Sequence, residues 1–144
     1  MNTDQINRIL KKLPVKGAVY AVDMLPAFVH YPSVMVCNTD PHNKPGQHWI
    51  AICFDCHGHG EYFDPYGLKP FPPFIPFLEK NSSTWIYNDV CLQSPISQTC
   101  GQHCLSFLIH RCRGLPMNTY INSLNKDLLK NDFQVYKFIK SISN

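Results

Sequence analysis

Apolar residues recur along the chain at two spacings, one typical of helices and one typical of strands. Near the start, apolar side chains three to four residues apart predict a helix over residues 3–13, with Thr3 as its N-terminal cap. Similar stripes predict helices over residues 100–113, with Thr99 as the cap, and over residues 132–142. Short apolar runs predict strands over residues 17–24, 33–37, 48–55, 61–64 and 84–92.

The strands over residues 48–55 and 61–64 are expected to form a hairpin, because a polar stretch containing glycine, residues 56–60, separates them. Alternate residues of the first strand face opposite ways, and both sets are largely apolar, as in a central strand. Antiparallel pairing returns Asp64 to the side of His48, although sixteen residues separate the two in sequence.

The segment over residues 69–77 contains four prolines and three phenylalanines. Proline lacks the N–H that a helix interior needs, so this segment is expected to be a rigid apolar cover over the core and not a regular helix. Irregular backbone is expected over residues 24–32, and a polar loop over residues 38–46.

Composition narrows the class of protein. The chain has 144 residues, of which 44% are hydrophobic and 16% charged, with a formal net charge of +3. These values predict one globular domain over residues 1–144, and the mild charge is not that of a strong nucleic-acid binder. No apolar run approaches the roughly 20 residues that a membrane span needs, and the polar start has no signal-peptide core. Seven cysteines, an odd number, predict free thiols in a reducing compartment.

Four polar residues carry the candidate chemistry: His48, Asp64, Gln93 and Cys100. A cysteine at the first turn of a helix is favoured as thiolate by the helix macrodipole, and more so beside an imidazole. Asp64 is expected to accept the second ring N–H of His48 and to fix the ring orientation. Gln93, at the end of the last predicted strand, and the Cys100 main-chain N–H are expected to stabilise an oxyanion. These are the parts of a cysteine hydrolase, in the chain order His, Asp, Cys.

Three other interpretations use part of the same sequence. Cys53, Cys56, His57 and His59 surround the predicted hairpin turn and resemble half of a zinc knuckle, although no second pair follows at finger spacing. The same Cys-x-x-Cys pair is a weaker candidate for thiol redox chemistry, since redox pairs normally open a helix. A non-catalytic module that binds a peptide without cutting it is the third alternative.

Other polar residues of the helix over residues 100–113 are assigned lesser roles. His103 is expected to face solvent, and Cys104 and Cys112 are expected to be buried. Two further glutamines are alternative oxyanion donors: Gln98 and Gln102.

The motifs together resemble those of the adenovirus protease family, adenain, and its relatives in viruses and in virus-like transposons of the Maverick or Polinton type. That family pairs a His-Trp strand with an aromatic-acid-Pro-aromatic-Gly turn, and places a glutamine seven residues before a Cys-Gly helix start. The corresponding residues here are Gly46-Gln47-His48-Trp49, Phe63-Asp64-Pro65-Tyr66-Gly67, Gln93 and Cys100-Gly101. Asp64 stands where adenain of the human type has glutamate.

The resemblance implies an α+β fold, with a central mixed β-sheet flanked by helices and the nucleophile Cys100 at the N-terminus of a central helix. It implies a cysteine endopeptidase that cleaves precursor proteins of a viral capsid or core after small residues such as glycine. Trp49 and Gly101 are expected to line its narrow substrate cleft. The wider clan includes proteases of SUMO and ubiquitin-like proteins, so a deubiquitinase or deSUMOylase is the competing function.

The resemblance also sets expectations for partners and location. A monomer acting on a protein or peptide substrate is expected, without a signal peptide, in the host cell nucleus or the virion. The sequence requires no cofactor and no metal, while activation by DNA or by a peptide stays open. Weak DNA binding is a further expectation, through the basic residues Arg111, Arg113, Lys126 and Lys130.

Overall fold

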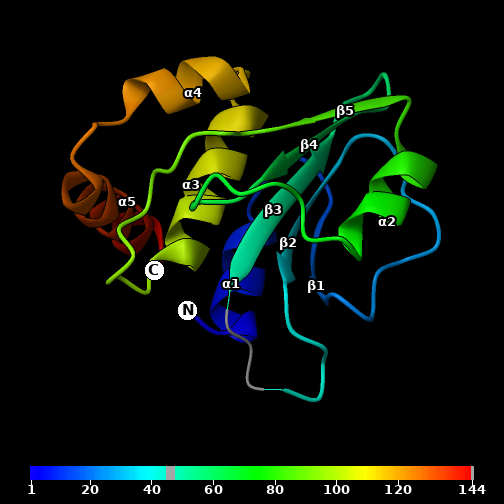
Figure 1. The fold of residues 1–144 in the computed structure, drawn as a ribbon, viewed down its shortest axis with the longest axis horizontal. Helices are drawn as coiled ribbons and strands as arrows, with labels where there is room; N and C mark the ends of the chain where they lie inside the picture. The colour runs from blue at the N-terminus through cyan, green and yellow to red at the C-terminus, as the bar shows by residue number, and fades with distance from the viewer. Residues whose placement is uncertain (45–47, 144) are drawn as a thin grey trace.

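The computed structural model describes residues 1–44 and 48–143, and these residues form a five-stranded mixed sheet with helices on both faces (Figure 1). The strands lie across the sheet in chain order. The two outer pairs are parallel and the two central pairs are antiparallel. The strands are β1 (Gly17–Ala21), β2 (Ser33–Asn38), β3 (Trp49–Phe54), β4 (His59–Phe63) and β5 (Thr84–Tyr87). The predicted α+β fold with a central mixed sheet is therefore confirmed.

Helices cover the two faces of the sheet unequally. On one face α3 packs against β3, with α1 beside it and with α4 and α5 on its outer side (Figure 1). The other face is covered by α2. The helices are α1 (Thr3–Leu10), α2 (Phe74–Asn81), α3 (Cys100–Cys112), α4 (Met117–Ser123) and α5 (Leu128–Ile142). Within the described ranges, no helix is long and apolar enough to cross a membrane.

Alternation along the strands divides the core between the two faces. Val36 and Ala51 pack in the cluster under α1 and α3, whereas Cys37 and Ile52 pack in the cluster under α2. Burial of an aliphatic side chain of this size contributes about 1.5–3 kcal/mol, so a register slip by one residue would be costly on both faces. The two apolar faces predicted for residues 48–55 are confirmed.

The predicted hairpin is also confirmed. β3 and β4 pair antiparallel, with Ala51 opposite Phe63. The residue after Phe63 therefore lies beside the start of β3. This register brings Asp64 next to His48.

The prediction of an irregular segment over residues 69–77 is wrong in its second half. α2 begins at Phe74, directly after Pro73, whose φ of −61° already suits a helix. Pro76 lies in the first turn, where a missing N–H costs no helical hydrogen bond. Phe77 and its apolar neighbours are buried under the sheet, which stabilises the helix despite the prolines.

The strand predicted over residues 84–92 is too long, because β5 covers only its first half. Asn88 turns inward and exchanges two hydrogen bonds with the main chain of Asp64, at 2.8 and 2.6 Å. The segment after Asn88 then lies against the turn that follows Asp64, where the Gln93 N–H donates to the Pro65 carbonyl at 3.0 Å. Gln93 therefore lies in irregular backbone and not at a strand end.

The bounds of several predicted elements need correction. Asn2, not Thr3, caps α1, through a reciprocal pair of hydrogen bonds with Gln5. α5 begins four residues earlier than predicted, because the Asp127 side chain accepts a hydrogen bond from Leu129 N–H. α1 and β1 are shorter than predicted, β4 begins two residues earlier than predicted, at His59, and α4 was absent from the predicted elements.

Gly67 allows the turn after Asp64 to lie against the segment that leads to Gln93. Its φ is +70°, and a Cβ there would lie 2.6 Å from the Val90 carbonyl oxygen and 2.7 Å from the Cys91 nitrogen. Gly67→Ala should therefore lower the free energy of unfolding by roughly 3 kcal/mol or more, from backbone strain plus the clash. Urea denaturation measures this change.

Gly114 supplies the matched control for that substitution. Its φ is +89°, but a Cβ there meets nothing within 4 Å. Gly114→Ala should therefore lower the free energy of unfolding through backbone strain alone, by about 1–2 kcal/mol. Equal losses at the two glycines would contradict the close packing of the turn against residues 90–91.

Candidate active site

Three predicted residues meet at one end of the sheet. His48 directly precedes β3, Asp64 directly follows β4, and Cys100 is the first residue of α3. The His48 Nε2 atom lies 2.7 Å from Asp64 Oδ1, and the Cys100 thiol is close enough to the His48 ring for each group to shift the pKa of the other. Gly46 and Gln47 of the predicted histidine motif, and part of the predicted loop over residues 38–46, lie outside the described residues.

The orientation of the His48 ring is set from two sides. Asp64 Oδ1 engages Nε2 and also accepts the Tyr66 main-chain N–H at 2.8 Å. The Tyr66 ring stacks on the imidazole, with centroids 4.8 Å apart and planes 20° from parallel. Since Nε2 is held by the carboxylate, Nδ1 is the ring nitrogen left for the thiol of Cys100.

The electrostatics of the site favour a thiolate beside an imidazolium. Burial lowers the pKa of His48, but hydrogen bonds and charge from Asp64 and Cys100 outweigh it and raise the pKa from 6.5 to about 9. Burial raises the pKa of the Cys100 thiol, but the His48 hydrogen bond and the main-chain N–H groups of Trp49 and Gly101 bring it below the ordinary 9.0. By linkage, the stability gained from the imidazolium is complete below pH 6.5 and is lost as pH rises through about 9.

A cleft of about 450 Å³ opens over these side chains. Trp49 lines this cleft as predicted, whereas Gly101 does not: it is buried, and a Cβ there would lie 3.2 Å from Met1 Cβ and 3.4 Å from Trp49 Cδ1. The Trp49 indole N–H is fixed by the Met1 carbonyl at 3.1 Å. The lining residues are Met1, His48, Trp49, Tyr66, Gln93, Ser97, Gln98 and Cys100.

Gln93 reaches this cleft with a side chain that is otherwise fully buried. Its Nε2 donates to the Ser97 carbonyl at 3.2 Å and to the Ser97 hydroxyl at 3.3 Å, whereas Oε1 has no partner among the described residues. As the first residue of α3, Cys100 has a main-chain N–H without an acceptor inside the helix. Of the alternative donors, Gln98 lines the cleft and Gln102 does not.

The prediction that His103 faces solvent is wrong. The side chain is fully buried, and its Nε2 lies 2.9 Å from Asp132 Oδ1 on α5. Burial lowers the pKa of His103, despite the carboxylate beside it. The sequence contained a sign of this contact, because Asp132 lies three residues before Val135 and therefore on the buried face predicted for the final helix. The buried position predicted for Cys104 is confirmed, while Cys112 is only half-buried.

Two further side chains of the site make contacts that the sequence did not predict, including Thr99, which was predicted to cap α3. Thr99 lies at the cap position of α3, but its side chain makes no capping bond and turns to the Asp132 carboxylate, at 3.1 Å. Ser97 contacts both Thr99 and Gln93. Serine and threonine are common in loops, so only the three-dimensional structure identifies these contacts.

Two of the four hairpin residues weighed as zinc or redox ligands have other side-chain contacts. Cys53 is buried in β3 and its thiol donates to Glu61 at 3.2 Å. His59 pairs with the Thr84 hydroxyl at 2.7 Å. Across residues 1–44 and 48–143, no three His, Cys, Asp or Glu side chains gather as metal ligands do.

Comparison with solved structures shows where this fold occurs. The ASFV pS273R protease matches 92% of this chain, with a TM-score of 0.65 and 18% identity. Its selenomethionine structure matches 72%, with a TM-score of 0.56 and 24% identity. ChlaDub1 from Chlamydia trachomatis matches 96%, with a TM-score of 0.59 and 14% identity, over 72% of its own chain. The protein therefore shares its fold with the ASFV pS273R protease and with ChlaDub1.

The likeness has a limited extent. This chain spans 43–62% of the length of the two ASFV protease chains. No protein-family model matches the sequence, and no curated protein matches it. These matches do not bear on the adenovirus protease itself, so the resemblance to adenain stays a prediction.

Replacing Asp64 by asparagine tests the coupling of the three side chains. Asp64→Asn removes the charge that helps to raise the pKa of His48, so we expect that pKa to fall and the thiolate pair to be lost at neutral pH. The measurement is the pH dependence of Cys100 alkylation by iodoacetamide, followed by mass spectrometry. The wild-type rate should rise well below the ordinary thiol pKa of 9.0, and the variant rate only close to it.

Asp23→Asn is the matched control, because it removes a carboxylate that lies 2.5 Å from the surface histidine His42. The exposed thiol of Cys56 provides an internal reference for alkylation. The profile at Cys100 should be unchanged in this control. Identical profiles for wild type and Asp64→Asn would contradict the coupling.

Proposed function

We propose that this protein is a cysteine peptidase in which Cys100 is the nucleophile, His48 the acid and base, and Asp64 the residue that orients His48. The observation that carries the proposal is the His48–Asp64 pair at 2.7 Å beside a thiol of lowered pKa. Positioned proton transfer of this kind typically contributes about 10²–10⁴ to a rate.

The proposed reaction has two stages. The Cys100 thiolate attacks the carbonyl carbon of the scissile amide, and the tetrahedral intermediate collapses as the His48 imidazolium donates its proton to the leaving amine. The acyl group is then a thioester on Cys100. Neutral His48 next takes a proton from water, whose oxygen attacks the thioester and releases the acid and the thiolate.

The oxyanion of each intermediate is proposed to accept the Cys100 main-chain N–H and one N–H of the Gln93 amide. The hydrogen bond from Gln93 Nε2 to the Ser97 hydroxyl is long, at 3.3 Å. We propose that it breaks when the same amide donates to the oxyanion. The bond to the Ser97 carbonyl would persist and hold the amide in place. A donor of this kind is worth roughly 3 kcal/mol in the transition state.

The proposed substrate is a protein or peptide cut after a small residue such as glycine. The Trp49 indole supports this choice, because it lines the cleft together with Cys100 and limits the room for a larger side chain. Processing of viral capsid or core precursors, by a monomer in the host nucleus or the virion, is the setting that the resemblance to adenain favours.

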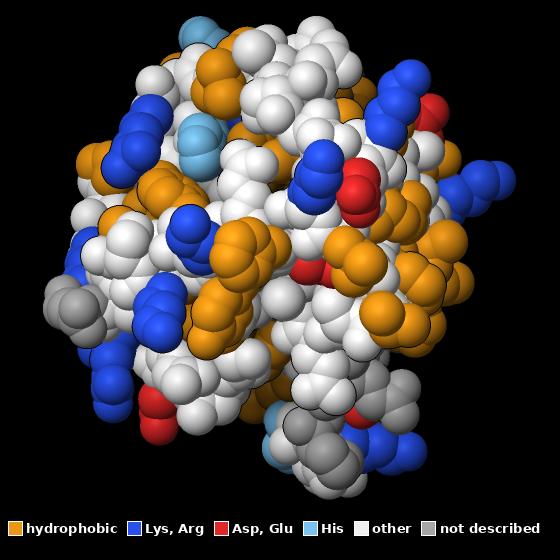
Figure 2. All heavy atoms as spheres, turned by 90° about the vertical axis from the view of Figure 1, so that its left-hand side faces the viewer, with side chains coloured by type: hydrophobic (Ala, Val, Ile, Leu, Met, Phe, Trp, Pro, Cys, Tyr) orange, Lys and Arg blue, Asp and Glu red, His pale blue; other side chains and the backbone are white. Residues whose placement is uncertain are grey.

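Cofactor dependence is part of the proposal as well. We propose a basal activity that needs no cofactor, with stimulation by DNA or a peptide as the extension to test. On the face bearing α4 and α5 the lysines and arginines are dispersed among apolar side chains (Figure 2). Arg111, one of the four basic residues considered for DNA, pairs with Glu61 at 2.6 Å. Both observations favour weak DNA binding over tight binding.

A second candidate is an isopeptidase acting on ubiquitin or a related modifier. The observation that favours it is the likeness to ChlaDub1, which covers 96% of this chain. The same thiol chemistry serves both functions, so the substrate alone separates them.

The deciding experiment compares a fluorogenic Leu-x-Gly-Gly peptide with a fluorogenic ubiquitin carrying the same reporter. We expect the wild type to release the reporter from the peptide and Cys100→Ala to release none, since no other group supplies the nucleophile. Cys56→Ala, which removes an exposed thiol at the hairpin turn, is the matched control and should retain activity. A much higher kcat/KM on ubiquitin would favour the isopeptidase, and silence on both, with DNA present or absent, would overturn the proposal.

A second substitution tests the oxyanion donor. Gln93→Ala should lower kcat by about 10²–10³ and leave the rate of Cys100 alkylation unchanged, because the donor acts only on the intermediate. Gln98→Ala, which removes an exposed amide of the same cleft, should leave kcat unchanged. A loss of kcat in Gln98→Ala and not in Gln93→Ala would identify Gln98 as the oxyanion donor.

A further inference from the structure

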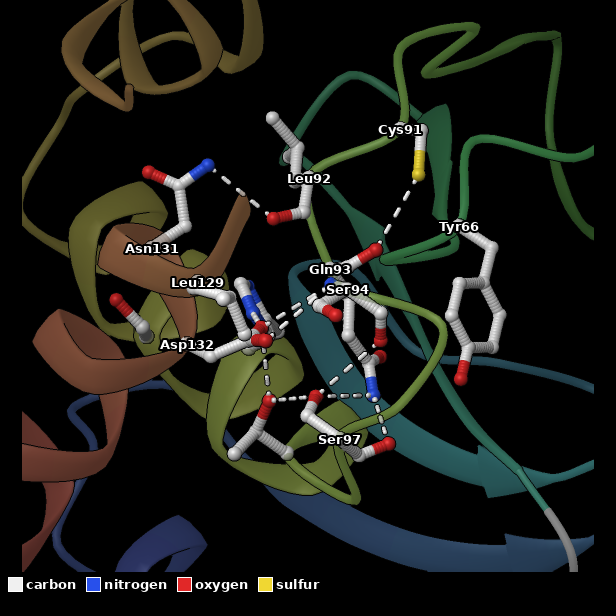
Figure 3. Close-up of polar contacts among 12 residues, drawn as sticks. Tyr66, Cys91, Leu92, Gln93, Ser94, Ser97, Leu129, Asn131 and Asp132 are labelled. Atoms are coloured by element: carbon white, nitrogen blue, oxygen red, sulfur yellow. Dashed lines mark hydrogen bonds and ion pairs between the residues drawn. The ribbon is translucent and has the colours of Figure 1, made fainter. Parts of the chain in front are cut away.

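Two consecutive residues of α5 hold the backbone on both sides of Gln93 (Figure 3). The Asn131 side chain donates to the Leu92 carbonyl at 3.1 Å. The Ser94 N–H donates to the Asp132 carboxylate, at 3.4 and 3.3 Å to its two oxygens. A helix far from the cysteine in sequence therefore fixes the segment that carries the proposed oxyanion donor.

The same carboxylate holds the start of α3. Asp132 Oδ1 accepts the Thr99 hydroxyl at 3.1 Å, and it lies 2.9 Å from His103 Nε2. Thr99 directly precedes Cys100 in the chain. One buried acid thus connects the neighbour of Cys100 with the neighbour of Gln93.

A line of side-chain contacts leads from Asp132 to the Gln93 amide (Figure 3). The Thr99 hydroxyl contacts Asp132, and the Ser97 hydroxyl lies 2.9 Å from the Thr99 hydroxyl. The Gln93 Nε2 then lies 3.3 Å from the Ser97 hydroxyl. We use "the relay" for the side chains of Asp132, Thr99, Ser97 and Gln93.

The carboxylate gives the relay a direction. An ionised carboxylate can only accept hydrogen bonds, so the Thr99 hydroxyl donates to Asp132 and its oxygen accepts from Ser97. The Ser97 hydroxyl then donates to Thr99, or over 3.4 Å to the Ser94 carbonyl, and in either case presents its oxygen to Gln93. An oxygen selects the NH₂ end of an amide over its carbonyl end. The Ser97 main-chain carbonyl, which can only accept, favours the same NH₂ end. The charge on Asp132 therefore reinforces the orientation of the Gln93 amide that the Ser97 carbonyl already favours.

We infer that Asp132 is a positioning residue for the oxyanion side of the site. It orients the Gln93 amide through the relay and fixes the distance between Gln93 and the start of α3. The inference rests on the proposed function, because Gln93 matters to turnover only if an oxyanion forms. Asp132 is buried, with 6% of its surface exposed, so protein groups and not water make most of its contacts.

The test substitutes Asp132 by asparagine, which keeps the shape but removes the charge and adds a donor. Asp132→Asn should lower kcat about tenfold or more, since small misplacements of a catalytic group are costly, while KM changes little. Cys100 alkylation should keep the wild-type rate and pH profile, because the His48–Asp64 pair is untouched. Thr99→Val, which removes the relay hydroxyl, should reproduce the loss of kcat, and Thr99→Ser should recover it.

Val135→Ala is the control for a purely structural role. Val135 is buried on the same helix and lines a cavity with His110 and Tyr120, which includes no residue of the relay. This variant should lower the melting temperature without changing kcat per alkylatable Cys100. A wild-type kcat in Asp132→Asn, or an equal loss of kcat in Val135→Ala, would overturn the inference.

An NMR measurement separates failure of the inference from failure of the proposed function. In a ¹⁵N-labelled protein, the Gln93 side-chain amide and the Ser94 main-chain amide should shift in Asp132→Asn and not in Val135→Ala. A wild type that cleaves nothing would contradict the proposed function alone, and these shifts would still support the positioning role of Asp132. Unshifted Gln93 and Ser94 signals would overturn that role even in an active enzyme.

Discussion

The packing of α3 across β3 and β4 is the contact on which the candidate site depends. One turn after Cys100, the fully buried Cys104 thiol donates to the Trp49 carbonyl at 3.4 Å. One turn further, Phe107 stacks on Phe63 with ring centroids 4.4 Å apart. Trp49 follows His48 in the chain, and Phe63 precedes Asp64. A single helix face therefore sets the position of Cys100 relative to both partners, and a shift of the helix would separate all three.

Two histidine–carboxylate pairs in this fold show how the surroundings decide what such a pair does. The His48–Asp64 pair, at 2.7 Å, and the His103–Asp132 pair, at 2.9 Å, have nearly the same geometry. Yet the pKa of His48 is raised and that of His103 is lowered. His48 keeps 17% of its side chain exposed and has a second anionic partner in the thiol, whereas the His103 side chain is fully buried. The first pair is the one proposed to transfer protons, and the second is the one proposed to hold the surrounding segments in position.

The parts of the site that the sequence could predict are those defined by short-range patterns. Antiparallel pairing across the short turn at residues 56–60 predicts that His48 and Asp64 meet, so this contact follows from residues 48–64 alone. The amphipathic stripe locates the helix that starts at Cys100. The surroundings of Gln93 could not be predicted in this way, because β5 ends early where Asn88 bonds back to the Asp64 turn. That bond pairs residues from two loops, and no periodic pattern records it.

The contact between His103 and Asp132 could be predicted in part. The helical spacing from Asp132 to Val135 and Ile139 places the acid on the buried stripe of α5, where an apolar residue would pack without the cost of burying a charge. A polar residue on an apolar stripe breaks the local rule, and such breaks are expected where function requires a particular group. In this fold the exception lies opposite the first turn of α3 and the loop that leads into it. The departure from the hydrophobic pattern is therefore the feature of α5 that carries information about the site.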